Sequence, residues 1–405
     1  MSRLSTRQRQ LLVLAVASQA SISIASWGLG ALGPDLAETF HLSAAGLGAI
    51  LAAGFIGNAI ILIPAGTLVD RSGPRRPLIV GGIASGICLV VAGFAPTAPL
   101  VGGALFVYGL TAAFVAVAGT VSVFHGFTAD RRGMALGFRQ MAVSAGGLIA
   151  AGLLPGLAAV GGIRLALVVS GILAGTFATL FGLASPPGAL HRDDRGRRDV
   201  RGLFRVPHIW RVVAISCVHV SALTTVLNFS VPALRDQGHT SVAGAVLFAI
   251  VSLSAMTSRL FWGRAADIGG GTRRRASLRD IGIVTVIGAL GYWIVAPQNP
   301  WVALPIMFVF AFGAMGANGV LYLIAGELAG PARAGQAVGF ISMVLFGVSG
   351  AVSPALGAIA DHFGFRALWL VAAAFGVASV LLTLGLPKDG SPASYAERAA
   401  TDIDG

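Results

Sequence analysis

Twelve apolar segments, each long enough to cross a lipid bilayer, follow one another along this 405-residue chain. A spanning helix needs about 20 predominantly apolar residues. The segments are residues 10–32, 44–67, 77–96, 99–125, 134–159, 163–184, 209–233, 241–264, 279–298, 301–326, 334–359 and 366–387. Only 11% of the residues are charged, against about 25% in an average soluble domain. The sequence therefore predicts an all-α membrane protein with 12 transmembrane helices.

The basic residues alternate between the two sides of the predicted membrane. Most of the 28 lie before the first segment or in every second connection after it. Only Arg164, Arg235 and Arg366 lie in the other connections, whereas Arg139 and Arg259 lie inside apolar segments. Because loops rich in arginine stay in the cytoplasm, we expect both termini there and the chain in the cell membrane. The net charge of +12 then reflects topology and contact with lipid headgroups, and we expect no nucleic acid as a partner.

The two halves of the chain repeat one another. Matching pairs keep their order along both halves, and they include His41 and His239, Gly66 and Gly263, Gly137 and Gly339, and Gly162 and Gly364. We predict a six-helix bundle over 1–185, a polar cytoplasmic linker over 186–208, a second bundle over 209–387 and a cytoplasmic tail over 388–405. The repeat therefore predicts two six-helix bundles of like topology, related by an axis along the membrane normal.

The loop after the second segment carries the most specific local pattern. Residues 66–76 read GTLVDRSGPRR, and the positions of interest are Gly66, Asp70, Arg71, Gly73, Arg75 and Arg76. Gly66 is small enough to allow close helix contact. Asp70 is an acid at the membrane boundary, where it needs a cation or a helix terminus as its partner. A plain basic loop between two helices is the alternative interpretation.

This loop resembles the signature loop of the major facilitator superfamily, whose members are secondary transporters. The resemblance implies two six-helix bundles that rock against each other, with the loop latching them on the cytoplasmic side. Gly263 and Asp267 occupy the matching positions of the second half, but Ile268 replaces the expected arginine. We therefore expect the second-half loop to be the weaker gate.

The two arginines inside spanning segments are the strongest candidates for a substrate site, because a charge in the membrane usually faces a cavity or a partner. Arg139 is followed by Gln140, and the repeat has uncharged residues at both positions. Arg259 precedes Gly263 by four residues, which resembles the oxalate and monocarboxylate carriers of the superfamily. There the arginine pairs with a carboxylate through its bidentate fork. Snorkelling of either arginine to the membrane surface is the alternative.

Other polar or aromatic side chains in the apolar segments are weaker candidates for lining a cavity: His219, Asn228, Asn318, Tyr322 and Trp27. Each is equally compatible with a role in helix–helix contact. The 16 acidic residues lie in loops or near segment ends. No acid is therefore placed to carry a proton through the middle of the membrane, and proton coupling is left open.

We predict a monomeric secondary transporter of a small organic solute, in particular an anion such as a carboxylate. The alternative is an exporter of drugs or metabolites that exchanges them for protons. A sensor that does not transport would need a signalling domain, and neither the tails nor the linker is long enough for one. An enzyme is not expected, because the sequence lacks a catalytic constellation, a metal-binding motif and a nucleotide-binding loop. Accordingly, no metal and no cofactor are expected.

Overall fold

A computed structural model describes residues 5–127, 129–186, 200–271, 273–295, 300–330 and 334–387. Its helices are α1 (Thr6–Gly28), α2 (Gly33–Phe40), α3 (Ala44–Ser72), α4 (Arg75–Phe94), α5 (Ala98–Gly126), α6 (Ala129–Ala184), a 3-10 turn (Val200–Arg205), α7 (Ile209–Asp236), α8 (Ser241–Gly271), α9 (Arg274–Val295), α10 (Pro300–Ala314), α11 (Ala317–Ala329), α12 (Ala334–Phe363) and α13 (Phe365–Leu384). The described residues contain no strand, so the all-α prediction is confirmed. Most of the predicted linker and the predicted tail lie outside the described residues.

The twelve predicted spans are all present. α6 is kinked at Gly161–Gly162, where both residues leave the helical conformation, so this long helix crosses the membrane twice. α10 and α11 together form one apolar span over Val302–Ala329. α2 has only eight residues and lies between the first two spans. With α2 left out, α6 counted twice and the α10–α11 pair counted once, the helices match the twelve segments.

The sequence repeat is also a structural repeat at two turns, one before the second part of α6 and one before α13. Gly162 and Gly364 have φ values of +67° and +78°, a region that favours glycine because it has no Cβ. In each case the arginine two residues later lies over an aromatic ring. The guanidinium carbon of Arg164 is 3.7 Å from the centre of the Phe94 ring, and that of Arg366 is 4.7 Å from the Trp293 ring. Both turns are therefore anchored in the same way.

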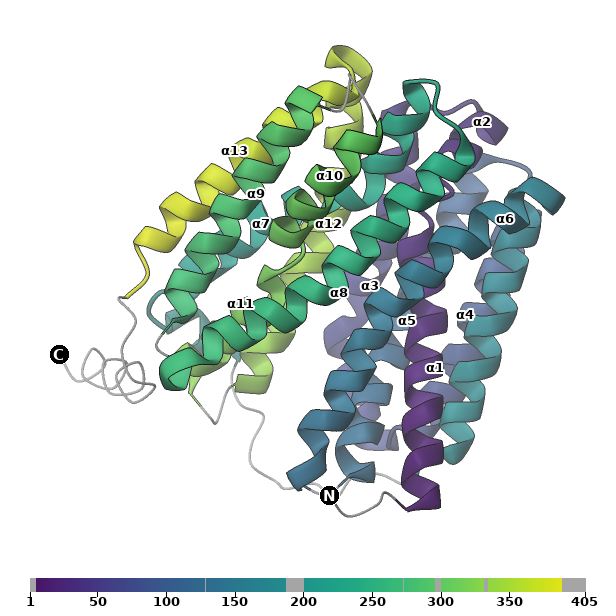
Figure 1. Ribbon diagram of the computed structural model, residues 1–405. Coiled ribbons are helices and arrows are strands. Elements are labelled where there is room, and N and C mark those ends of the chain that lie inside the picture. Colours follow the sequence, from purple (N-terminus) through teal and green to yellow (C-terminus); the bar gives the residue numbers. More distant parts are fainter. Residues whose placement is uncertain are drawn as a thin grey trace.

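The helices form two groups, which Figure 1 shows in purple to teal for the first half and in teal to yellow for the second. In the first half, α6 packs along α1 and α4, and α5 packs between α3 and α4. In the second half, α9 packs along α10 and α13, and α7 packs against α12 and α13. The halves meet mainly where α3 runs along α12 and where α6 runs along α8.

We call the end of the molecule that carries Arg71 and Arg76 the basic end, and the opposite end the far end. At the far end the two halves touch backbone to backbone. A Cβ on Gly48 of α3 would lie 2.5 Å from the carbonyl oxygen of Ser353 in α12. A Cβ on Gly357 would lie 2.5 Å from the carbonyl carbon of Ala44. Only glycine permits such contacts, so the halves are closed together at the far end.

A side chain also joins the halves at the far end. One carboxylate oxygen of Asp361, in α12, accepts a hydrogen bond from the N–H of Ala44 at 2.7 Å, and the other accepts one from Ala45 at 2.8 Å. These N–H groups belong to the first turn of α3, where they have no partner within their own helix. An acid of the second half therefore caps a helix of the first half.

The basic end differs from the far end. Gly66, Gly137, Gly263 and Gly339 occupy equivalent places near this end in α3, α6, α8 and α12. At each of them, a Cβ would have no neighbouring atom of the described structure within 4 Å. The close helix contact expected at Gly66 is therefore not made in this conformation. The halves meet at the far end and do not touch at these four positions.

Candidate functional site

Arg259 of α8 reaches across the boundary between the halves. Its Nη1 donates a hydrogen bond to the hydroxyl of Ser144 in α6 at 2.9 Å. Its guanidinium carbon lies 5.1 Å from the centre of the Trp27 ring of α1, within cation–π range. Tyr322 of α11 lies near it. We call Arg259, Ser144, Trp27 and Tyr322 the Arg259 cluster, and it joins two helices of each half.

The cluster continues toward the far end along the faces of α6 and α8. Ser252 lies about two turns before Arg259 on α8, and its buried hydroxyl has no hydrogen-bond partner among the described residues. A Cβ on Gly147 of α6 would lie 2.9 Å from that hydroxyl oxygen and 3.7 Å from a carbon of the Trp27 ring. A free polar atom therefore lies where α1, α6 and α8 come together.

The charge of Arg259 is not balanced within the described part of the chain. Among the described residues, the Arg259 side chain makes one hydrogen bond, through Nη1, and no carboxylate is paired with its guanidinium. An unbalanced charge in a spanning helix is costly unless it faces water or a partner. The cluster can therefore present the remaining N–H groups of one guanidinium to an anion.

Arg139 takes a different position from Arg259. Its Nη1 donates to the Thr120 hydroxyl at 2.8 Å, and its Nη2 donates to the carbonyl of Ala116 at 3.0 Å, both in α5 of the same half. A Cβ on Gly119 would lie 2.6 Å from Nη2, and Arg139 is only 5% exposed. Arg139 therefore fills a space beside α5, and the structure does not bring it together with the Arg259 cluster.

This placement predicts that Arg139→Ala lowers stability without changing substrate affinity. The substitution leaves a void beside Gly119 and removes the hydrogen bonds from Arg139 to α5, so the free energy of unfolding should fall by about 2 kcal/mol or more. The KM for a transported solute should stay within about twofold of the wild-type value. Thermal unfolding and uptake kinetics measure the two effects. A tenfold or larger rise in KM at unchanged stability would instead place Arg139 in the binding site.

Two other predicted site residues lie inside the second half. His219 of α7 is 2% exposed and lies beside the backbone of Ala314, and its Nε2 has no partner among the described residues. Asn228, also in α7, donates a hydrogen bond from Nδ2 to the Ser353 hydroxyl of α12 at 3.0 Å. This bond favours a role for Asn228 in holding α7 against α12.

The remaining candidates lie closer to the interface or the surface. Asn318 and Tyr322 are one turn apart on α11, and Oδ1 of Asn318 is buried without a partner among the described residues. Tyr322 also shares a hydrogen bond with the Ser342 side chain of α12. Gln140 is exposed next to the buried Arg139. Asn318 therefore lies on the same face of α11 as Tyr322, which is a member of the Arg259 cluster.

The predicted gating loop turns as its sequence indicates. α3 ends at Gly73, whose φ is +73°, and Pro74 precedes the first residue of α4. Arg71 and Arg76 are exposed, and Arg75 is half-buried. Gly263 is half-buried in α8. The side chains of Asp70 and Asp267 lie outside the described structure, so their predicted role in gating stays a prediction.

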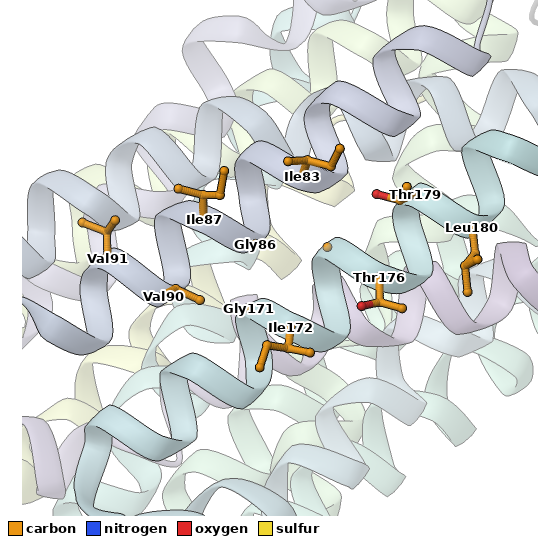
Figure 2. Close-up of a pocket in the computed structure, with 11 residues that line it drawn as sticks. Ile83, Gly86, Ile87, Val90, Val91, Gly171, Ile172, Thr176, Thr179 and Leu180 are labelled. Carbon is orange, nitrogen blue, oxygen red and sulfur yellow. The ribbon is translucent and has the colours of Figure 1, made fainter.

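An apolar groove lies away from this interface, between α4 and the second part of α6 (Figure 2). It has a volume of about 550 Å³, and the only polar side chains that line it are Thr176 and Thr179. Ile87 and Ile172 on its rim are 58% and 56% exposed. A groove of this kind suits lipid acyl chains and offers no charge to select a polar solute.

Ser144 and Ser252 lie in the candidate site but were not predicted from the sequence. Serines are frequent in these helices, and many donate to a carbonyl of their own helix, as Ser170 does to Ala166 at 2.8 Å. A serine in an apolar segment therefore gives no signal of its own.

Comparison with known proteins agrees with this architecture. A family model described as Major Facilitator Superfamily matches residues 15–354. An uncharacterized MFS-type transporter of Mycobacterium tuberculosis is 26% identical over 333 residues, covering 80% of this chain and 73% of the relative. The oxalate:formate antiporter of Oxalobacter formigenes is 27% identical over 352 residues, covering 81% of this chain and 79% of the antiporter.

Solved structures show the same fold. The crystal structure of a D-xylose–proton symporter superposes with a TM-score of 0.78 at 17% identity, covering 94% of this chain and 98% of the symporter. The twelve spans, the two bundles and the family match agree with one another. This chain belongs to the major facilitator superfamily of membrane transporters.

Proposed function

We propose that the protein is a secondary transporter that carries a small organic anion, such as a carboxylate, between its two halves by alternating access. Arg259 is the group that binds the negative charge. The observation that carries the proposal is its guanidinium, which lies at the junction of α1, α6 and α8 and has no carboxylate partner among the described residues. Similarity to the oxalate:formate antiporter supports the anionic class of solute.

The proposal also assigns a state to the structure. If the basic end faces the cytoplasm, as the distribution of arginines indicates, the closed far end makes this the cytoplasm-facing state. The gating loop and the four open glycines, Gly66, Gly137, Gly263 and Gly339, then form the surfaces that meet when the basic end closes. Coupling to protons and a monomeric state remain predictions.

Uptake by purified protein in liposomes tests the function. A radiolabelled panel of carboxylates, sugars, nucleosides and cationic drugs is offered, and accumulation is compared with that in protein-free liposomes. Because a single cation selects negative solutes, at least one carboxylate should accumulate and should be displaced by other carboxylates. Sugars and nucleosides should not compete.

The control is the same panel in vesicles of opposite membrane orientation, with an imposed pH gradient in each direction. Accumulation of cationic drugs alone, driven by an acid interior, would support the exporter and contradict the proposal. Transport of a neutral solute without any effect of carboxylates would contradict it as well.

A further inference from the structure

We infer that the site accepts monocarboxylates in preference to dicarboxylates, an inference that rests on the proposed function. Among the described side chains, one guanidinium lies at the junction of the halves, whereas an extended dianion needs a positive partner at each end. The preference therefore depends on whether any second cation can reach the Arg259 cluster.

Arg139 is the obvious second cation, but its guanidinium is held against α5 of its own half. Nη1 donates to the Thr120 hydroxyl, and Nη2 donates to the carbonyl of Ala116. The close approach to Gly119 restricts the guanidinium to that position, and Arg139 is only 5% exposed. The N–H groups that these bonds do not use therefore stay buried beside α5, and Arg139 cannot reach a substrate at the Arg259 cluster without leaving α5.

α11 and α12, the other helices of the second half next to the cluster, offer no second arginine or lysine. α11 carries the neutral side chains of Asn318 and Tyr322 instead. His219 of α7 is buried against the Ala314 backbone, and in the described structure no interaction joins it to Arg259. Toward the far end, Arg259 is followed by the Trp27 ring and the lone hydroxyl of Ser252.

A second carboxylate would therefore leave water without gaining a cation, which is unfavourable. The tail of a monocarboxylate, in contrast, meets an aromatic face and a hydroxyl. An apolar tail or one with a neutral hydroxyl or carbonyl group matches these surroundings, and the second charge of a dicarboxylate does not.

Acids matched in carbon number test the inference. Propionate is compared with malonate, and butyrate with succinate, by competition against uptake of a labelled monocarboxylate in liposomes at a pH where all carboxyls are ionised. Each dicarboxylate should compete about tenfold more weakly than its partner, which corresponds to one missing charge contact. Competition by the monocarboxylates should disappear in Arg259→Gln. Arg139→Lys is the matched control and should leave the ratio unchanged.

The failure of this inference differs from the failure of the proposed function. If either dicarboxylate competes as well as its matched monocarboxylate, and Arg259 is still required, the single-cation inference is overturned while anion transport stands. If no acid of either kind is transported or competes, the proposed function itself fails.

We also infer, from a different observation, that Asp361 biases the transport cycle toward the far-end-closed state. Its carboxylate accepts two hydrogen bonds from the first turn of α3, and this helix terminus also carries a partial positive charge. Opening the far end must separate α12 from α3 and break both bonds. In the sequence repeat, the residue equivalent to Asp361 is Ala159, which lies opposite the start of α8. Alanine has no carboxylate, so this pair of hydrogen bonds exists on one side of the pseudo-symmetric interface only.

Spin labels at Thr39 and Phe363, which are exposed at the far end on opposite halves, measure this bias in a background without Cys88 and Cys217. Asp361→Ala should raise the population of the longer distance about threefold or more, and Asp361→Asn, which keeps one acceptor, should raise it less. Asp280→Ala is the control, because Asp280 pairs only with its neighbour Arg279 among the described residues. An unchanged distance distribution in both Asp361 variants would overturn the inference.

Discussion

Arg259→Gln is expected to raise the KM for the transported anion by about 30-fold or more, with little change in stability. Removing one partner of a desolvated, hydrogen-bonded charge pair costs about 2 kcal/mol or more, and about 1.4 kcal/mol corresponds to a factor of ten in affinity. The folded protein loses only one described hydrogen bond, the one to Ser144. Concentration-dependent uptake in liposomes gives KM, and thermal unfolding gives the stability.

Two variants of the same helix make this result specific. Arg259→Lys keeps the charge but loses the planar fork, so its KM should fall between those of wild type and glutamine. Arg264→Gln removes an exposed arginine near the basic end and should have no effect on KM. Equal KM values for wild type and Arg259→Gln would show that the anion does not contact Arg259.

Gly357→Ala is expected to abolish at least about nine-tenths of transport by blocking closure of the far end. A Cβ there would lie 2.5 Å from the carbonyl carbon of Ala44 and 2.6 Å from the Cα of Ala45. Both atoms belong to the backbone of α3, so no flexible side chain can move aside. α12 must move away from α3, and the conformation with a closed far end becomes inaccessible.

The measurement combines uptake with labelling of a cysteine placed in the central interface by a reagent that cannot cross the membrane. Labelling through the far end should increase in Gly357→Ala as uptake disappears, while the purified protein stays monodisperse. Gly156→Ala in α6 is the matched control, because a Cβ there meets no atom within 4 Å. Normal uptake by Gly357→Ala would mean that the far-end contact is not part of the cycle.

The sequence predicts the number and the limits of the spans well, because lipid imposes a simple requirement on length and polarity. It misses local irregularities. The kink at Gly161–Gly162 joins two predicted spans into one long helix, and residues 33–40 form a short helix between spans. These features depend on a few dihedral angles and on packing at the far end, which an apolar pattern does not record.

The site is predicted less completely than the fold. Both internal arginines are equally visible in the sequence as charges in apolar segments, but only packing decides where each one points. Arg139 turns toward α5 because Gly119 leaves space for its guanidinium and Thr120 accepts a hydrogen bond. That pairing joins helices whose register against one another cannot be obtained from a single sequence.

Arg259, in contrast, lies at the boundary between the halves, where it contacts Ser144 and Trp27 of the first half. Its partners come from α1, α6 and α11, so Trp27 and Tyr322 could be proposed individually but not as one cluster. The partner Ser144 carries no distinguishing signal in its segment. The charge of Arg259, which has no carboxylate partner among the described residues, is what makes this site recognisable once the helices are placed.

A cryo-EM structure of the protein with a bound monocarboxylate tests the central claim most directly. We expect density for the carboxylate within hydrogen-bond distance of the Arg259 guanidinium, with the rest of the acid beside Trp27 and Ser252. Density for the acid beside another group, with Arg259 still bound only to Ser144, would contradict it.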